Sequence, residues 1–281
     1  MRVDAHQHFW NLERVAYPWL TPNYPPLLRT FEPPELEPQL RAAGIDSTVL
    51  VQAANSYADT EYMLLQADRY LWIGAVVGWV PLLEPREAEL ALDRYLLHPA
   101  FRGVRHLIHD EPDPDWIMQE SAIEGLRVLS ERKIPFDFVA VFPNHLRHVP
   151  TVAECVPDLR IIIDHLAKPP IKTGEMEPWA TQLAAAASSS NVYAKISGLN
   201  TAASWGAWTA ADIKAYIDVA IDCFGVDRLM FGSDWPYATL SGDDYATVWT
   251  ETNRALEGRT PAEMDALLGG TAARVYGIAD R

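Results

Sequence analysis

The feature that most constrains the fold is a regular alternation of short apolar segments with longer stretches of helical periodicity. The apolar segments are rich in β-branched and aromatic residues, which is typical of buried strands. Strands are predicted at residues 3–8, 47–52, 73–80, 102–105, 135–141, 160–164, 191–196 and 228–231. Each strand with its following helix has roughly the thirty residues that a parallel βαβ unit needs.

Helices are predicted between and after these strands, at residues 35–43, 59–70, 86–97, 117–132, 144–155, 179–188, 210–224, 243–256 and 261–268. Eight such units predict an α/β protein with a single (β/α)₈ TIM-type barrel domain over residues 1–281. A doubly wound sheet is the alternative, but no GxGxxG sequence follows the first strand. Residues 11–34 are rich in proline and aromatic residues, which favours an ordered cap over an opening.

The excess of acidic over basic residues limits which kinds of partner the chain can bind. A formal net charge of −15 argues against nucleic acid and anionic membranes, because both attract positive surfaces. The longest apolar run, residues 71–83, is too short to span a bilayer, and no secretory signal opens the chain. Cys155 and Cys223 have no metal-binding spacing. We therefore predict a cytoplasmic protein with a small-molecule partner, and no pattern indicates its oligomeric state.

Two histidines lie two residues apart near the start of the chain. Side chains alternate along a strand, so Asp4, His6 and His8 are expected to share one face. Two converging imidazoles suit either a divalent metal ion or a reacting oxygen that needs a hydrogen-bond partner.

Polar residues at the carboxyl ends of barrel strands normally form the active site. His6 and His8 end the first strand, His165 ends the sixth and Asp234 ends the eighth. The first and eighth strands are neighbours in a closed barrel, so these four side chains are predicted to surround one point. Asp164 is expected to support its neighbour. Structural roles are favoured for the remaining candidates in this class, His106, His109, His145 and His148.

Three cations and several aromatic residues are candidates for contacts with a substrate. Arg105 and Lys168 follow strands and would bind a carboxylate or an oxyanion, or else pair with a nearby acid. Lys195 lies inside the seventh strand, where a buried amine needs a partner. Flat rings near the predicted site suit either stacking on a sugar or core packing, and these are Trp10, Trp205, Trp208, Trp235 and Tyr237.

Five motifs taken together resemble the sugar-lactonase branch of the amidohydrolase superfamily, which includes L-fuconolactonase and L-rhamnonolactonase and is related to 2-pyrone-4,6-dicarboxylate lactonase. They are DAHQHFW at residues 4–10, GVRH at 103–106, DHLAKP at 164–169, KISGL at 195–199 and FGSDWP at 231–236. The resemblance covers essentially the whole chain. It implies a distorted (β/α)₈ barrel and hydrolysis of a sugar lactone to a hydroxy acid.

The resemblance also implies roles for individual residues. His6 and His8 match the first-strand HxH motif, and His165 and Asp234 match the histidine and aspartate positions after strands six and eight. Arg105 stands where two-metal members carry a bridging lysine, and Val139 to Val141 replace the strand-five histidine of the decarboxylases. A two-metal site is therefore not expected. Either no metal is required, or one divalent cation such as zinc binds His6, His8, His165 and Asp234.

We expect Asp234 to act as general base on the attacking water, and His165, Arg105 or Lys168 to stabilise the oxyanion. His6 and His8 would hold a cation or position the water directly. Two other functions stay open from the sequence. One is a metal-dependent decarboxylase on the same scaffold, and the other is a non-catalytic carbohydrate-binding protein that uses the tryptophans alone.

Overall fold

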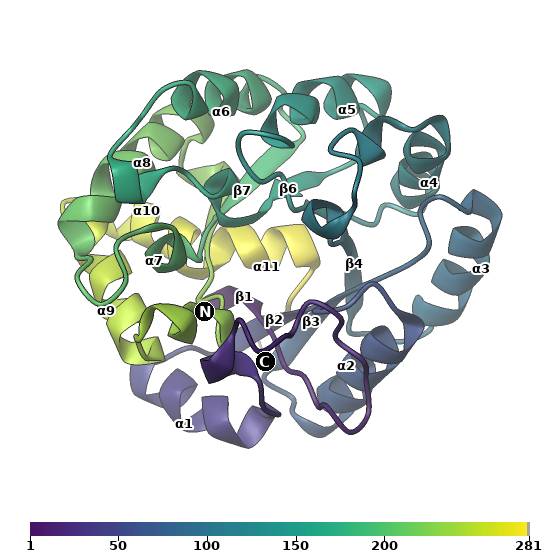
Figure 1. Ribbon diagram of the computed structural model, residues 1–281, viewed down its shortest axis with the longest axis horizontal. Coiled ribbons are helices and arrows are strands. Elements are labelled where there is room, and N and C mark those ends of the chain that lie inside the picture. The colour runs from purple at the N-terminus through teal and green to yellow at the C-terminus, as the bar shows by residue number, and fades with distance from the viewer. Residues whose placement is uncertain (280–281) are drawn as a thin grey trace.

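The computed structural model describes residues 1–279, and residues 280 and 281 lie outside the described part. Eight parallel strands form one sheet in sequence order, surrounded by helices (Figure 1). The strands are β1 (Val3–Gln7), β2 (Ser47–Val51), β3 (Ile73–Gly78), β4 (Phe101–His106), β5 (Phe136–Phe138), β6 (Ile161–Ile163), β7 (Val192–Ile196) and β8 (Leu229–Phe231). The predicted α/β class and (β/α)₈ barrel are confirmed. A single domain over residues 1–281 stays a prediction.

Helices cover the outside of the strands, and some of them begin at side-chain caps. Ser56 accepts a hydrogen bond from the Asp59 amide at the start of α2, and Thr209 with Asp212 forms a capping box at the start of α8. The helices are α1 (Pro33–Ala43), α2 (Tyr57–Arg69), α3 (Pro85–Tyr95), α4 (Glu120–Glu131), α5 (Val149–Cys155), α6 (Trp179–Ala187), α7 (Leu199–Ala202), α8 (Ala210–Phe224), α9 (Tyr245–Ala255), α10 (Pro261–Asp265) and α11 (Thr271–Tyr276). In the described residues, none of these helices is both long and apolar enough to cross a membrane.

Backbone hydrogen bonds join the two ends of the sheet just beyond β8. The Asp234 amide donates to the His6 carbonyl at 2.7 Å, and the His8 amide donates to the Trp235 carbonyl at 2.7 Å. Gly232 permits this approach, because a Cβ there would lie 2.6 Å from the Cβ of His6. The end of β1 and the residues after β8 are thus held side by side.

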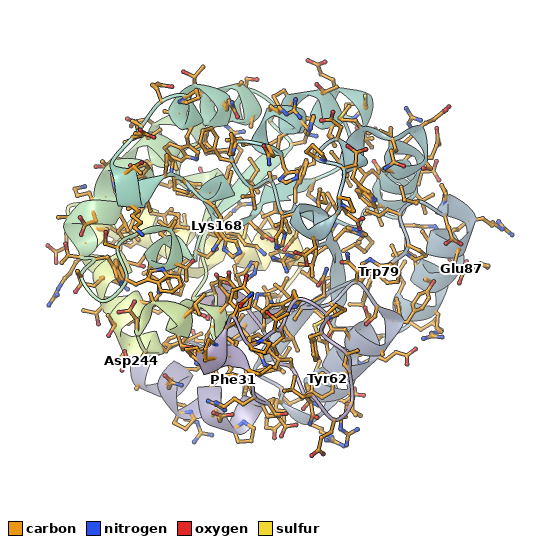
Figure 2. All side chains as sticks on the ribbon, viewed as in Figure 1. Phe31, Tyr62, Trp79, Glu87, Lys168 and Asp244 are labelled. Carbon is orange, nitrogen blue, oxygen red and sulfur yellow. The ribbon has the colours of Figure 1, made fainter. Side chains whose placement is uncertain are left out.

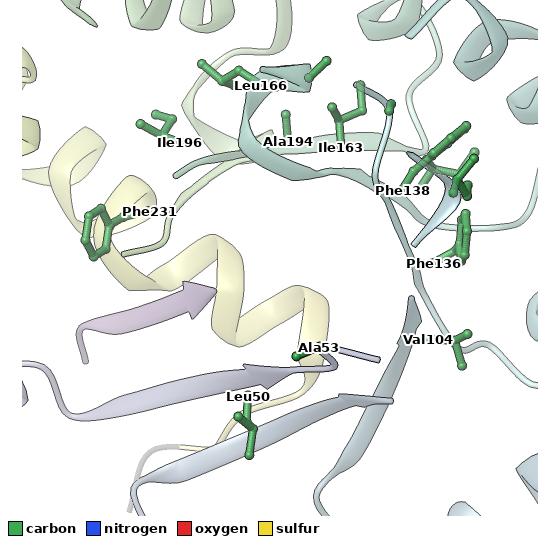
Figure 3. Close-up of a cluster of buried hydrophobic side chains, with 14 of the residues drawn as sticks. Leu50, Ala53, Val104, Phe136, Phe138, Ile163, Leu166, Ala194, Ile196 and Phe231 are labelled. Carbon is green, nitrogen blue, oxygen red and sulfur yellow. The ribbon is translucent and has the colours of Figure 1, made fainter. Parts of the chain in front are cut away.

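Alternation along the strands separates an outer apolar layer from the barrel interior. Phe136, Phe138 and Ile163 belong to the larger cluster, together with side chains from the surrounding helices (Figure 3). Asp137, between the two phenylalanines, instead meets Lys195 and Tyr276. Strands that are buried on both faces are apolar at most positions, which is why they stand out in the sequence as short apolar runs.

Helix α11 fills the end of the barrel opposite the strand carboxyl ends. Its Ala272, Val275 and Tyr276 pack against inward-facing residues of the strands, which are Val3, Ala5, Val49, Val51, Ala75, Val77, Ile162 and Met230. The predictions omit this helix. In the sequence, the pair Gly269-Gly270 indicates the end of a helix. In the structure, position 269 needs glycine for another reason, because a Cβ there would lie 2.2 Å from the Met1 carbonyl oxygen.

Other element boundaries differ from the predicted ones. The helix predicted at residues 144–155 begins only at Val149, because residues 146–148 form a 3₁₀ turn before Pro150. The helix predicted at 261–268 ends at Asp265 and continues as a wider π-helical turn over residues 266–270. The fifth strand is shorter than residues 135–141 and covers only Phe136–Phe138.

Tyr276→Phe is expected to destabilise the fold while keeping the ring that fills the base of the barrel. The hydroxyl donates to the two carboxylate oxygens of buried Asp137 at 2.8 and 3.0 Å. Loss of a hydrogen bond to a charged group costs about 1.5–3 kcal/mol, which urea denaturation measures. Tyr193→Phe is the control, because its hydroxyl makes no hydrogen bond to residues 1–279. Equal losses in the two variants would contradict this role of Tyr276.

Candidate active site

The first strand ends with two histidines whose rings meet inside the barrel. His6 and His8 are buried, and their Nε2 atoms lie 3.1 Å apart. His8 Nδ1 lies 2.8 Å from the Val51 carbonyl oxygen, which only accepts hydrogen bonds. His8 Nδ1 therefore carries the proton in the neutral ring, and its Nε2 presents a lone pair toward His6.

Asp4 does not share this face, so that prediction is wrong. The pairing of β1 with β2 shifts between Asp4 and Gln7, and this irregularity breaks the alternation. The Asp4 carboxylate accepts hydrogen bonds from the Ser233 amide at 2.8 Å and from the Tyr245 hydroxyl of α9 at 3.1 Å. Asp4 thus fastens the end of the barrel to an outer helix.

Asp234 lies beside both histidines because of the closure between β1 and β8. Its Oδ1 is 3.4 Å from His8 Nε2 and 3.8 Å from His6 Nε2. Its φ of 58° is left-handed, which costs a non-glycine residue on the order of 1 kcal/mol. Its Oδ2 is buried and has no hydrogen-bond partner among residues 1–279. The buried Oδ2 atom is therefore available to accept a hydrogen bond from a bound molecule.

The turn after β6 brings a histidine and a lysine to the same carboxylate. His165 Nδ1 lies 3.8 Å and Lys168 Nζ 3.6 Å from Asp234 Oδ2. Residues 165–168 all have φ between 48° and 63°, a left-handed run without glycine that is maintained at an energetic cost. Ser197 Oγ lies 2.8 Å from His165 Nδ1 and fixes that ring. Lys168 lies near the centre of the barrel view (Figure 2).

Burial and neighbouring charges set the ionisation of these groups. Burial alone would raise the pKa of the Asp234 carboxyl, but His165 and Lys168 bring the pKa well below its ordinary value. Burial lowers the pKa of His6 and of His165 well below the usual imidazole range. At neutral pH, Asp234 is therefore a carboxylate and the two imidazoles are neutral.

Three of these atoms form a donor set that fits a divalent cation. His6 Nε2, His8 Nε2 and Asp234 Oδ1 are separated by 3.1, 3.4 and 3.8 Å. Ligand atoms around a tetrahedral zinc ion, with bonds of about 2.0–2.1 Å, lie about 3.3 Å apart. A second group of possible ligands, His6, Asp164 and His165, shares one histidine with this set.

A layer of buried ion pairs lies directly beneath the site. Lys195 contacts Asp137 and lies 3.2 Å from Asp164 Oδ1, so the amine has the partners that its burial requires. Arg105 Nε donates to Asp164 Oδ2 at 2.7 Å, and its Nη1 donates to the Gln52 carbonyl at 2.9 Å. Burial would raise the pKa of Asp164, but Lys195, His6 and Arg105 bring it well below its ordinary value.

Asp137 was missed by the sequence analysis. The available signal was a single acid that alternates with two phenylalanines on an apolar strand, which places its side chain inside the barrel.

A cavity of about 310 Å³ opens over these groups, within the size range of small-molecule sites. Of the predicted residues, those that line it are His8, Trp10, Arg105, His165, Lys168, Trp205, Asp234 and Tyr237. Trp235 is not among the lining residues; its ring packs 5.8 Å from Phe9 and 5.5 Å from Phe31. His6 is buried and is not among the lining residues.

Further lining residues were not predicted to be in the site. Trp19 and Tyr24 come from the irregular segment 11–34, whose aromatic content predicted a cap. His109 also lines the cavity, although the sequence favoured a structural role for it. His106, by contrast, is buried against Trp116, with ring centroids 4.1 Å apart.

Comparison with known proteins identifies the family. Residues 3–278 match the family model described as amidohydrolase. The chain belongs to the amidohydrolase family.

Several relatives of this amidohydrolase are close over the full length. An L-fucono-1,5-lactonase from Burkholderia ambifaria is 35% identical over 290 residues, which cover 99% of this chain and 96% of that protein. Crystal structures of an amidohydrolase from Burkholderia multivorans, one with bound HEPES and one with bound zinc, share 32% identity and have TM-scores of 0.91 and 0.89, each covering 99% of this chain and 100% of that one.

A more distant structure shares the fold. This Pseudomonas putida protein, proposed to be a 2-pyrone-4,6-dicarboxylic acid hydrolase, is 21% identical with a TM-score of 0.75, over 100% of this chain and 98% of that one.

Asp59→Asn is expected to change how the stability of this amidohydrolase depends on pH. Asp59 holds the cavity wall by accepting hydrogen bonds from the Ala53 and Ala54 amides at 2.8 and 3.0 Å. Burial raises its pKa from 3.8 to about 6. The folded protein therefore binds the proton more tightly than the unfolded chain, and the associated stability is present below pH 4 and lost as pH rises through 6.

Urea denaturation between pH 4 and 7 measures this effect. Wild-type protein should lose about 2–3 kcal/mol relative to Asp59→Asn over that range, since one pKa unit corresponds to about 1.4 kcal/mol. Asp158→Asn at an exposed turn serves as the control. Parallel stability curves for wild type and Asp59→Asn would contradict the raised pKa.

Proposed function

We propose that this amidohydrolase hydrolyses a sugar lactone, such as L-fuconolactone, to the hydroxy acid. The observation that carries the proposal is the buried Asp234 carboxylate, which lines the cavity and whose Oδ2, close to His165 and Lys168, has no hydrogen-bond partner within residues 1–279. The L-fucono-1,5-lactonase relative supports the substrate class. A cytoplasmic location and a small-molecule partner belong to the same proposal.

Asp234 is the general base in this proposal. Its Oδ2 accepts a proton from a water molecule as that water attacks the lactone carbonyl carbon. The carboxylate needs no prior deprotonation, because its pKa lies well below the ordinary value. When the tetrahedral intermediate collapses, the bond from the acyl carbon to the ring oxygen breaks. Asp234 returns its proton to that oxygen, so the acid and the free hydroxyl are released together.

Lys168 and Arg105 stabilise the oxyanion that forms on the carbonyl oxygen. Lys168 Nζ donates to Thr201 Oγ1 at 2.9 Å, which directs the ammonium toward the cavity. Arg105 uses Nε and Nη1 for Asp164 and Gln52, and its Nη2 makes no hydrogen bond within residues 1–279. Preorganised cations of this kind stabilise developing charge without reorganising during the reaction. His165, fixed by Ser197, is a further donor at the same wall.

Aromatic rings provide the walls that hold the sugar. Trp10, Trp19 and Tyr237 line the cavity, and Lys168 Nζ lies 5.2 Å from the centre of the Tyr237 ring. Such rings stack on the apolar faces of a sugar while the hydroxyls meet the polar groups.

If a divalent cation binds, His6, His8 and Asp234 would hold it, with His165 at the edge of the site. It would supply Lewis-acid polarisation of the carbonyl, and Asp234 Oδ2 would remain available for the proton. Both routes, with and without one cation such as zinc, use the same residues of the chain.

Charge balance favours a neutral lactone over the carboxylated substrate of a decarboxylase. Arg105 pairs with Asp164, Lys168 with Asp234 and Lys195 with Asp137. Within residues 1–279, each of these three cations is thus matched by an acid, which leaves no surplus positive charge at the site to attract a carboxylate. A non-catalytic sugar-binding role remains the third hypothesis, but it leaves the cost of burying Asp234 without a purpose.

Asp234→Asn is expected to lower turnover of the preferred lactone by roughly a hundredfold or more, the scale of losing a general base. The amide has nearly the shape of the carboxylate but does not accept the proton. A pH-indicator assay measures acid release, and circular dichroism checks the fold. Asp222→Asn, at an exposed position of α8, is the control. Near-normal turnover in folded Asp234→Asn would remove Asp234 from the mechanism.

A screen of aldonolactones with the same assay tests the function itself. We expect proton release with L-fucono-1,5-lactone or a close stereoisomer, run on the protein as purified and again after chelation. Loss of turnover on chelation and its return with zinc would assign the cation an essential role. Carbon dioxide release from a carboxylated substrate, or saturable lactone binding without acid release, would contradict the proposed lactonase.

A further inference from the structure

The His6 ring has two neighbours at Nδ1 that require opposite protonation. Asp164 Oδ1 lies 3.2 Å away and only accepts a hydrogen bond when ionised. Lys195 Nζ lies 3.1 Å away and only donates. The first contact requires a proton on Nδ1 and leaves a lone pair on Nε2, whereas the second requires the reverse. The choice decides what His6 presents to the active site.

The hydrogen bonds around Asp164 favour the first arrangement. Its Oδ2 is already bound by Arg105 Nε at 2.7 Å, while Oδ1 makes no hydrogen bond in the described residues and has only the Lys195 ammonium 3.2 Å away as an ion pair. A proton on His6 Nδ1 would satisfy that oxygen. Lys195 does not depend on His6, because it contacts Asp137 and, at 3.2 Å, Asp164.

The opposite side of the His6 ring gives the same result when a cation is bound. His8 Nε2 carries a lone pair, since His8 Nδ1 donates to the Val51 carbonyl. Asp234 Oδ1 is an acceptor 3.4 Å from it. With a lone pair on His6 Nε2, three acceptors converge at separations suited to one cation. With a proton there, His6 Nε2 would instead donate to His8 Nε2 across their 3.1 Å contact and take the place of the cation.

We propose that Asp164 is a positioning residue that holds His6 in the Nδ1–H form, so that the Nε2 lone pair joins His8 and Asp234 in a divalent-cation site. Arg105 and Lys195 keep the Asp164 carboxylate in place from two other directions. A carboxylate behind a ligating histidine orients the ring and strengthens it as a ligand. The inference deepens the proposed function and rests on it only where lactone turnover is the readout.

Nuclear magnetic resonance of ¹⁵N-histidine-labelled wild-type protein tests the proposal without any substitution. In metal-free protein, the His6 Nδ1 signal should have the shift of a protonated ring nitrogen and the Nε2 signal that of an unprotonated one. Zinc should then move the Nε2 signals of both His6 and His8. The opposite assignment for His6, or a zinc response at Nδ1, would overturn the proposal.

A matched pair of variants separates positioning from stability. Asp164→Asn and Asp137→Asn each remove one buried carboxylate from Lys195, but only Asp164 contacts His6. Asp164→Asn should weaken zinc affinity by about 10–100-fold in a chelator competition. Asp137→Asn should change it less than threefold. Equal weakening in the two variants would show a general effect of the charged layer and overturn the specific role.

Turnover provides a further readout that a purely structural defect would not reproduce. Where chelation abolishes wild-type turnover, the kcat of Asp164→Asn should be low at limiting zinc and should rise toward the wild-type value with excess zinc, while KM for the lactone stays nearly constant. Failure of zinc to rescue kcat in folded protein would contradict the proposal. Absence of lactone turnover in the wild type would instead count against the proposed function alone, since the NMR and zinc-affinity results do not depend on the substrate.

Discussion

Two backbone hydrogen bonds between the end of β1 and the residues after β8 determine the geometry of the site. They fix the amide of Asp234 on the carbonyl of His6 and the amide of His8 on the carbonyl of Trp235. Because the strands are buried, the bonds are shielded from water and hold the two segments in one register. A carboxylate from one end of the chain is thereby kept within 4 Å of imidazoles from the other end.

A layer of buried charged residues beneath the cavity is the second feature that fixes the site. Asp137, Asp164, Lys195 and Arg105 are nearly or completely buried, so each charge is tolerable only with its partners in place. Helix α11 excludes water from below through Tyr276, and the site lies above. The barrel thus has an apolar base, an ionic middle and a reactive top. The buried ion pairs of the middle layer hold the His6 ring in place relative to the strands and take no part in the proposed chemistry.

Much of this arrangement is predictable because a closed parallel barrel has strong rules. Strand ends at one face collect the reactive groups, so His6, His8, His165 and Asp234 were expected together, and the structure brings them together. Lys195 was expected inside the barrel with a partner, and Asp137 and Asp164 are those partners. Arg105 was expected to bind a carboxylate or an oxyanion or to pair with a nearby acid, and its largely buried guanidinium pairs with Asp164.

The features that escaped prediction depend on tertiary contacts. The strand irregularity after Asp4 arises from pairing with β2 and has no local sequence signal. The left-handed backbone at residues 165–168 contains no glycine, so its composition does not predict that conformation. Helix α11 follows Gly269-Gly270, a pair that is typical of a helix C-terminus. Only the structure shows that Gly269 is required by the close approach of Met1. Sequence patterns thus predict elements and their order, whereas packing decides where an element bends.

The central claim is that a water molecule held at Asp234 attacks the carbonyl carbon of a lactone. Hydrolysis of L-fucono-1,5-lactone in ¹⁸O-labelled water, followed by mass spectrometry of the acid product, tests it most directly. The account predicts one ¹⁸O atom in the carboxylate and none in the released hydroxyl. Label in the hydroxyl would contradict it, because that outcome requires attack at C5, the carbon that bears the ring oxygen, instead of attack at the acyl carbon.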